Sequence, residues 1–424
     1  MPIPTKDSPP SRSLTKKGMA TRAAILDGAH EVFKETGYYG SSISEITRRC
    51  GVSMGTFYQY FKNKEQVFLE LNDLIVSRFM NRAESLSVEG LDFEDRFSKA
   101  IKLLYHHTRD NFAFHRILGE SELIDRVTIA YYESIARYYR NFLRREAQYG
   151  NIRPLDPNMV AYGLIGICYF HSFKWGEAEQ HISQQRLVDL IIDLLMDGIA
   201  GLAPWKRPSD WEITTLPEPI ALHPKSDGPL SKGEKTRRAI LRAGEKVVSQ
   251  YGVNRANIAE ITREAGVAQG TFYVHFESKR DLIEGFVKYI NRLMRQELQR
   301  YVAQTRDRRD AERVGILAFY EFLRQHCEIY RVVPEYEMIG REVALWYYNK
   351  IAHGYIRGLE QGIQRGEIRD FPAAFLARSL MGLTHFIGLK WIIWATDSHA
   401  QIPGQLLQDI IHLVLYGLKT SQRE

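Results

Sequence analysis

The amino-acid sequence repeats itself once over most of its length, and this duplication constrains the fold more than any other feature. Residues 21–68 align with residues 236–283 without a gap, and about 20 of the 48 aligned positions are identical. Weaker matches continue along each half at an offset that grows only from 215 to 216, as for Asp193 and Asp409. A period this long indicates two complete units in tandem rather than a solenoid of short repeats.

A proline-rich segment separates the two units. Residues 203–230 hold six of the 15 prolines in the 424-residue chain. This composition favours an extended linker, which at about 3.1 Å per residue could span roughly 85 Å. The linker is therefore long enough for the two units to fold against each other.

Apolar residues recur within each unit at the spacing of an α-helix. Ile25, Ala29 and Val32 follow an i, i+4, i+7 pattern, and the same pattern starts again at Ile240. No convincing alternation of apolar and polar residues indicates a strand. We therefore expect an all-α fold.

Helix caps recur at the same place in both units. Ser42 and Glu45 match the capping box, in which the Ser side chain caps the third helical amide and the Glu side chain reaches back. Asn257 and Glu260 repeat this pattern with an Asn cap. A helix of about eight residues is expected to begin at each cap.

A glycine turn and a second short helix follow each capped helix. Gly51 and Gly266 stand where a helix ends in the left-handed conformation that glycine tolerates. The second helix then starts from Ser53 or Ala268. Two short helices joined by a tight glycine turn form a helix-turn-helix, whose second helix enters the major groove of DNA.

The second helix of this motif divides into a buried and an exposed face. The aromatic pairs Phe57–Phe61 and Phe272–Phe276 are spaced i, i+4 and would face the core. The glycine before each threonine permits a phosphate strand to approach closely. The positions left available to DNA are Met54, Thr56, Tyr58, Gln59 and Tyr60 in the first unit, and Gln269, Thr271, Tyr273, Val274 and His275 in the second.

These residues resemble the DNA-binding motif of the TetR/AcrR family of bacterial transcription regulators. The family pattern G-V-[ST]-x-G-[TS]-[LF]-Y-x-[HY]-F-x-[NS]-K is met by residues 51–64 and, apart from Ala268, by residues 266–279. The resemblance implies that each unit is a three-helix DNA-binding head followed by a larger helical bundle with an effector pocket and a dimer interface. It also favours a ligand-responsive repressor. The tandem arrangement departs from the family's usual single unit per chain, which acts as a homodimer.

The same resemblance assigns contacts to individual residues. Those implied to contact DNA phosphates are Thr56, Tyr58, Lys64, Thr271, Tyr273 and Lys279, and those near base edges are Met54, Gly55, Tyr60, Gln269, Gly270 and His275. The cap residues Ser42, Ser53 and Asn257 complete the set of predicted DNA-binding residues. We predict no catalytic residue and no metal ligand.

Six regions are expected along the chain. In order, they are a flexible arm (1–18), a first helix-turn-helix domain (19–70), a first helical ligand and dimerisation domain (71–202), the linker (203–230), a second helix-turn-helix domain (231–285) and a second helical ligand and dimerisation domain (286–424).

Positive charge is concentrated in the two predicted heads. Residues 1–70 hold ten Lys and Arg against seven Asp and Glu, and residues 231–285 hold the same numbers. Each head therefore carries a net charge of +3, and together they account for the +6 of the whole chain. This distribution supports double-stranded DNA as a partner. Basic residues that precede each helix-turn-helix, including Arg22 and Arg237, could also touch DNA.

The helical bundles are predicted to hold an interface and an effector. The last two helices of each unit are the most apolar stretches, and their glycines Gly163, Gly166, Gly382 and Gly388 would allow close helix contact. Aromatic residues are dense, and the candidates for the lining of a ligand pocket are Phe114, Tyr132, Phe170, Trp175, Tyr348, Phe386 and Trp391. The expected effector is a small hydrophobic or amphipathic molecule.

Enzymatic and membrane functions are disfavoured. The sequence has no phosphate-binding glycine loop, nucleophile elbow or HExxH motif, so we expect neither an enzyme nor a cofactor. Residues 187–202 carry an Asp at positions 189, 193 and 197, which indicates an amphipathic helix rather than a membrane span. The three cysteines are too scattered for a disulfide framework, and no secretory signal is recognised, so a cytoplasmic location is expected.

Three arrangements are compatible with this pattern. In the first, the two units form a covalent pseudo-dimer on an asymmetric operator, since their recognition helices differ in sequence. In the second, like units pair between chains and give four DNA-binding heads. In the third, the chain is a ligand-binding or interaction module with one active head, an alternative motivated by the missing cap at Ala268.

Overall fold

The computed structural model describes residues 15–86, 89–118, 122–173, 182–207, 231–334, 341–395 and 400–420. Within these ranges the regular elements are helices, apart from one isolated bridge between Ala200 and Ile368. The predicted all-α fold is therefore confirmed. The chain divides into two compact units, residues 1–78 and residues 79–424. No helix among the described residues is both long enough and apolar enough to cross a membrane.

The first compact unit is a small helical head. Its helices are α1 (Lys16–Gly40), α2 (Ile43–Cys50), α3 (Met54–Tyr60) and the first part of α4 (Lys64–Glu84). Ile25, Phe33 and Ile46 are fully buried between them, as is Phe57. The aromatic face predicted for the second helix of the motif, Phe57 and Phe61, thus lies in the core of the head.

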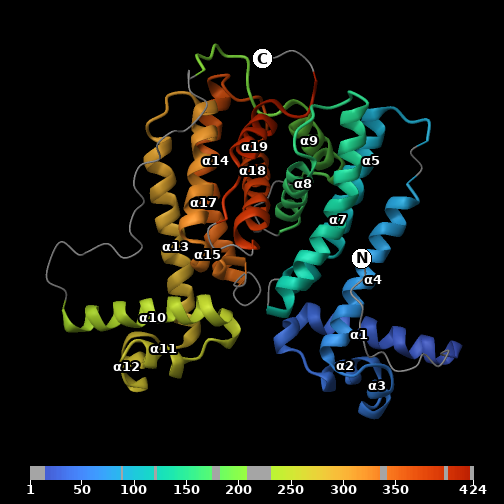
Figure 1. Ribbon diagram of the computed structural model, residues 1–424, viewed down its shortest axis with the longest axis vertical. Helices are drawn as coiled ribbons and strands as arrows, with labels where there is room; N and C mark the ends of the chain where they lie inside the picture. Colours follow the sequence, from blue (N-terminus) through green and yellow to red (C-terminus); the bar gives the residue numbers. More distant parts are fainter. Residues whose placement is uncertain are drawn as a thin grey trace. The chain divides into compact units, whose positions relative to one another are not determined.

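The second compact unit contains the rest of the first repeat and all of the second (Figure 1). The first repeat supplies α5 (Phe93–Asp110), α6 (Phe112–Ile117), α7 (Glu122–Gln148), α8 (Pro157–Ser172) and α9 (Gln184–Asp197). The second repeat supplies α10 (Lys232–Arg255), α11 (Ile258–Glu264), α12 (Gln269–His275), α13 (Lys279–Val302), α14 (Arg308–Gln325), α15 (Cys327–Tyr330), α17 (Arg341–Gln364), α18 (Ala373–Gly388), a π-helical turn η1 (Leu389–Ile393) and α19 (Gly404–Tyr416). Since α14 repeats the bounds of α5 at an offset of 215 and α18 repeats those of α8 at 216, the duplication extends to the helices of the bundle.

The two repeats pack on each other through α8 and α18, which lie side by side in Figure 1. The two helices cross at Gly166 and Gly382. A Cβ atom built on Gly166 would lie 2.6 Å from the carbonyl carbon of Gly382, and one built on Gly382 would lie 2.7 Å from that of Gly166. Only glycine fits at either position, and the close helix contact that was predicted at these glycines is present. Gly388, by contrast, faces Leu323 of α14 in its own repeat.

Segments that follow α9 and α19 add reciprocal backbone hydrogen bonds between the repeats. Ile199 and Ala200 donate to the carbonyl oxygens of Val414 and Leu415, both at 2.9 Å. In the opposite direction, Leu418 donates to the carbonyl oxygen of Leu195 at 2.8 Å. These bonds satisfy backbone groups at the helix ends that would otherwise need other partners. The helical parts of the two repeats are therefore held together by main-chain as well as side-chain contacts.

One buried arginine fixes the start of the predicted linker. The guanidinium of Arg309, only 2% exposed, donates to the carbonyl oxygens of Gly201 (3.2 Å) and Ala203 (2.9 Å) and to the carboxylate of Asp307 (2.7 Å). Its centre lies 4.7 Å from the ring of Trp205. The chain is thus held as far as Trp205, while residues 208–230 of the linker and residues 1–14 of the arm lie outside the described residues.

Candidate nucleic-acid interface and effector cavity

The predicted capping box organises the first helix of the motif in the first repeat. Ser42 Oγ accepts from the Glu45 amide at 3.2 Å, and the Glu45 carboxylate accepts from the Ser42 amide at 2.8 Å. Gly51 follows with a φ of 68°, in the left-handed region that favours glycine. These local interactions fix the angle at which α3 leaves the turn.

The second repeat keeps this framework in part: Asn257 caps α11 without the return bond from Glu260 that was predicted, and the side-chain cap before α12 is missing. Asn257 Oδ1 accepts from the Glu260 amide at 2.9 Å, and Gly266 has a φ of 67°. At the start of α3, Ser53 Oγ accepts from the Thr56 amide at 3.0 Å. Ala268, which stands in the same place before α12, provides no side-chain hydrogen bond. The Thr271 amide of α12 instead donates to the backbone carbonyl oxygen of Ala268 at 2.9 Å, so α12 lacks only the side-chain acceptor that α3 has.

Ala268→Ser is expected to supply this missing cap. The backbone at Ala268 (φ −71°, ψ 150°) already matches that at Ser53 (φ −74°, ψ 158°), so a serine can cap without rearrangement. The gain should be about 1 kcal/mol, or roughly fivefold slower amide exchange in α12. Hydrogen exchange measured by mass spectrometry tests this. Ser53→Ala is the matched control, with the opposite effect in α3; unchanged exchange in both variants would contradict the assigned caps.

Large side chains on α3 and α12 are exposed. Tyr58 and Tyr273 are 53% and 58% exposed, and Val274 is 78% exposed. Burying such apolar surface is favourable, so its exposure on two equivalent helices suits a surface that a partner covers. The other predicted contact residues on these helices, Met54, Gly55, Gln269 and Gly270, are also exposed, and Thr56, Tyr60, Thr271 and His275 are half-buried.

The glycines at the start of these helices are not required by the fold. A Cβ atom on Gly270 would meet no atom within 4 Å, and one on Gly55 would meet only Ser53 Oγ, at 3.7 Å. Since glycine weakens a helix relative to alanine, these glycines lower the stability of the heads without a packing reason. The open space above them is available to a molecule that approaches from outside.

Some basic residues predicted to reach DNA are engaged within the heads. The Lys64 ammonium donates to the carbonyl oxygens of Tyr38 (2.5 Å) and Ser41 (2.7 Å), between the end of α1 and the start of α2. Lys279 makes the equivalent bonds to the carbonyl oxygens of Val253 (3.0 Å) and Ala256 (2.9 Å). Sequence reasoning missed this internal role, and the predicted phosphate contacts of both lysines stay predictions.

The arginines before the motif are also held internally. Arg22 pairs with Glu70 and lies 5.1 Å from the centre of the Phe61 ring. Arg237 lies 4.8 Å from the centre of the Phe276 ring. Both repeats thus use the same arginine to cover the aromatic core of the head.

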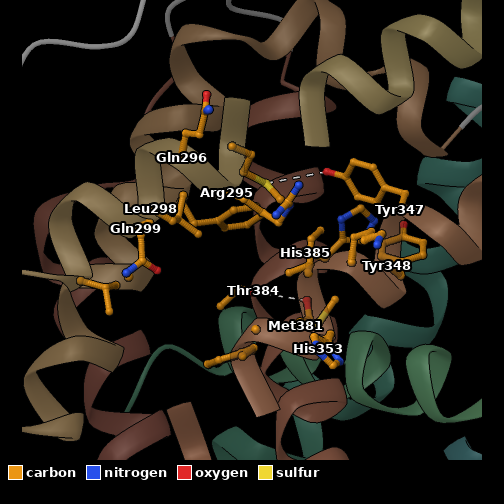
Figure 2. A pocket seen from close by; sticks show the side chains of 18 of the residues that line it. Arg295, Gln296, Leu298, Gln299, Tyr347, Tyr348, His353, Met381, Thr384 and His385 are labelled. Carbon is orange, nitrogen blue, oxygen red and sulfur yellow. Dashed lines mark hydrogen bonds between the residues drawn. The ribbon is translucent and has the colours of Figure 1, made fainter. Parts of the chain in front are cut away.

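A cavity of about 1370 Å³ lies in the bundle of the second repeat. It is bounded by α13, α14, α17 and α18, and Phe170 of α8 in the first repeat completes its lining. In Figure 2, Leu298 and Gln299 of α13 lie across the cavity from Tyr347 and Tyr348 of α17. This volume exceeds the roughly 300–1000 Å³ of typical ligand pockets, so the cavity has room for a small molecule.

The interior of the cavity is buried and aromatic. Tyr330, Tyr347 and Tyr348 line it together with His385, and all four side chains are buried. Nδ1 of His385 and the Tyr330 hydroxyl are 2.9 Å apart. Burial lowers the pKa of His385 to about 3, so this imidazole is neutral near pH 7. The interior therefore suits an apolar group.

Two of the predicted pocket residues, Phe170 and Tyr348, line this cavity. Four others lie outside its lining: Phe114 packs on Tyr131, Tyr132 and Phe386 pack on each other with their ring centres 5.2 Å apart, and Trp391 packs on Tyr162. Trp175 lies outside the described residues. In the described part of the chain, no cluster of three or more His, Cys, Asp or Glu residues could hold a metal ion.

Comparison with known proteins identifies the heads. A family model described as bacterial regulatory proteins of the tetR family matches residues 25–71 and residues 240–285. The transcriptional regulator YhgD of Bacillus subtilis is 22% identical over 184 residues, which cover 42% of this chain and 95% of YhgD. The fatty acid metabolism regulator protein of the same organism is 29% identical over 184 residues, 41% of this chain and 93% of the relative.

Among solved structures, Bacillus subtilis FadR in complex with stearoyl-CoA is 22% identical with a TM-score of 0.36, and the match covers 41% of this chain and 96% of FadR. Each relative thus has the length of about one repeat, and the two from sequence comparison are described as regulators rather than enzymes. The chain belongs to the TetR/AcrR family of transcriptional regulators, and it carries two units of this family in tandem.

Proposed function

We propose that the chain acts as a covalent pseudo-dimer, in which each repeat reads one half of a single asymmetric operator. The observation that carries this proposal is the pattern of difference between α3 and α12. The buried aromatic pair and the turn glycine are the same in both heads, but the outward positions differ: Met54, Gln59 and Tyr60 correspond to Gln269, Val274 and His275. Two heads with the same buried framework but different contact residues are suited to an operator whose two half-sites differ in sequence.

The packing of the two helical domains supports this arrangement. In a two-fold helix-turn-helix dimer, the recognition helices meet half-sites about one turn of DNA apart, roughly 34–36 Å. Here the glycine crossing of α8 and α18 joins the repeats within one chain, in the role that a subunit interface has in a homodimer. Tethering also raises the effective concentration of the second head to the millimolar range.

We further propose that an effector controls DNA binding, and that the chain represses transcription when no effector is bound. The cavity of the second repeat supplies the space, and the relative described as a fatty acid metabolism regulator makes a fatty-acid-derived effector a natural choice. An effector that binds better to a conformation with displaced heads would lower operator affinity by linkage.

Replacing the open glycines separates DNA binding from folding. Gly55→Ala and Gly270→Ala should each stabilise the protein by roughly 0.5–1 kcal/mol. Each should also lower operator affinity by about tenfold, the scale of one lost base or phosphate contact. Gel-shift titrations and footprints of each variant test this, and each variant should lose protection in a different half-site.

Gly285→Ala in α13 is the matched control. A Cβ atom there meets nothing within 4 Å, so the protein should gain stability while DNA affinity stays unchanged. If Gly270→Ala left the affinity and the footprint unchanged while Gly55→Ala altered both, the chain would have one active head. This outcome would favour the interaction-module alternative, for which the uncapped Ala268 is the motivating observation.

A further inference from the structure

The cavity of the second repeat is lined by positive charges that the first repeat lacks at the corresponding positions. On α13, Arg292, Arg295 and Gln299 are spaced i, i+3, i+7 and all line the cavity. On α17, Lys350 and Arg357 line it seven residues apart. These side chains are exposed, whereas the tyrosines of the interior are buried. The cavity thus has an aromatic interior and a cationic rim.

The rim cations have few internal partners. Among the described residues, no carboxylate forms an ion pair with Arg292, Arg300, Lys350 or Arg357; Arg295 donates to the side-chain oxygen of Asn291 at 2.8 Å. Glu312 is the one carboxylate among the described residues that line the cavity, and it is paired with Arg308. An anionic group at the rim would therefore meet several cations without competing carboxylates.

The first repeat has no such rim in its sequence. The residues that correspond to the cations at positions 292, 295, 300, 350 and 357 are Ser77, Met80, Ser85, Ser134 and Asn141. None of these five carries a positive charge, so the first repeat lacks the cations that form the rim in the second.

Buried side chains close the interior of the first repeat. His107 Nε2 lies 2.8 Å from the Tyr131 hydroxyl, which lies 3.2 Å from His115 Nε2, and His115 Nδ1 lies 3.1 Å from the Tyr132 hydroxyl. Tyr131 and Tyr132 correspond to the cavity-lining Tyr347 and Tyr348. The polar atoms of this cluster are satisfied by one another.

Two large aromatic side chains also pack against this cluster. Phe79 packs on His107 with the ring centres 4.8 Å apart, and the second repeat has the slimmer Met294 at the corresponding position. Trp394 of the second repeat stacks on Tyr132 of the first, with the ring centres 5.6 Å apart. The residue that corresponds to Trp394 in the first repeat is Ala178. Aromatic rings thus pack against the cluster of the first repeat at both of these positions.

One phenylalanine from each repeat crosses the interface. Phe170 of α8 enters the lining of the cavity, where its ring centre is 5.1 Å from that of Tyr348. Phe386 of α18 occupies the symmetric place and packs on Tyr132 at 5.2 Å. Phe170 follows Gly166 by one helical turn, and a Cβ atom on Gly382 would lie 3.1 Å from the Cβ of Phe170. Whatever displaces Phe170 therefore acts directly on the helix crossing.

We propose that only the second repeat senses the effector, and that one amphipathic anion binds there per chain. The anionic group of this molecule lies at the cationic rim, and its apolar tail lies against Phe170 of the first repeat. The tail moves α8 relative to α18, and one binding event reaches both heads. This inference rests on the proposed regulatory function and specifies the effector's class, its number and the residue that reports its binding. An acyl chain with an anionic head meets these requirements, as a free carboxylate or as a coenzyme A thioester.

Calorimetry on the full chain tests the inference, with palmitate and palmitoyl-CoA as separate probes. We expect one probe molecule per chain for at least one of the two, and the probe that binds identifies the head. Phe170→Leu should weaken this binding by about tenfold, because the tail loses an aromatic contact. Lys350→Ser, which introduces the residue of the first repeat, should weaken it by a similar factor and make it less sensitive to salt.

Phe386→Leu is the matched control. It removes the symmetric ring from the same interface, so any general weakening of the α8–α18 contact should appear in both variants. Probe affinity should stay within twofold of the unsubstituted protein in Phe386→Leu. Two molecules bound per chain, equal losses in the two variants, or no binding of either probe would each overturn the inference.

The same titrations, repeated with operator DNA, separate this inference from the proposed function. A chain that binds its operator but neither probe would overturn only the effector assignment. A chain that binds the probe with a stoichiometry of one but no operator would overturn the regulatory function and leave the site itself standing.

Discussion

Gly166→Val is expected to lower the melting temperature by about 5 °C or more, one of the two largest stability losses we predict. Even the first carbon of the new side chain would lie 2.6 Å from the carbonyl carbon of Gly382 and 2.9 Å from the Cβ of Phe386. Both neighbours belong to α18, so α8 and α18 must move apart along their crossing. Overpacking of this kind costs about 1–3 kcal/mol or more, because the backbone cannot yield as a flexible side chain would.

Calorimetric melting of Gly166→Val and Gly382→Val should give similar losses, since the two glycines meet each other. Gly285→Ala provides the contrast: its Cβ lies in open space, and the melting temperature should rise slightly. If Gly166→Val had the same melting temperature as the unsubstituted protein, the helices would not cross at this point.

Arg309→Met is expected to destabilise the chain by about 3 kcal/mol. The substitution removes the donor that joins the carbonyl oxygens of Gly201 and Ala203 to the carboxylate of Asp307. Breaking a buried charged network by removing one partner typically costs about 3–5 kcal/mol, because the other groups remain buried without a partner. Methionine fills much of the same volume, so the loss reports the polar network rather than a cavity.

The same substitution should free the start of the linker. Lys206 follows directly after the held segment, so tryptic cleavage of the bond after Lys206 should become faster by about an order of magnitude. Denaturant unfolding and timed proteolysis measure the two effects. Arg324→Met, which removes a half-exposed pair with Glu321, should change stability by less than about 1 kcal/mol. Equal losses in the two arginine variants would contradict the anchoring role of Arg309.

Sequence reasoning could predict the heads because their signals are local. The Ser42–Glu45 box, the left-handed glycines and the exposed Tyr58 are each fixed by residues within one or two helical turns. The missing cap at Ala268 could be read in the same way. The repeat itself was visible as an offset, without any knowledge of the fold.

Two lining residues of the cavity, Phe170 and Tyr348, could be predicted, but the contact between them and the difference between the repeats could not, because both depend on contacts between distant segments. Nothing near Phe170 in the sequence indicates that its ring enters the other repeat, 178 residues before Tyr348. Lys64 matched a family position for phosphate contact, and its bonds to carbonyl oxygens near α1 appear only in the fold. Two signals were present but unused: the cations of α13 and α17 occur at helical spacing, and they have no counterpart in the first repeat.

The most direct test of the pseudo-dimer is to find the operator and count the chains bound to it. Footprinting of the full chain on its own upstream region, and then on genomic fragments, should locate the site, and the mass of the complex in solution gives the number of chains. The account predicts one chain on two unlike half-sites, with their centres about one turn of DNA apart. A longer symmetric site that carries two chains would contradict it and establish the four-headed assembly instead.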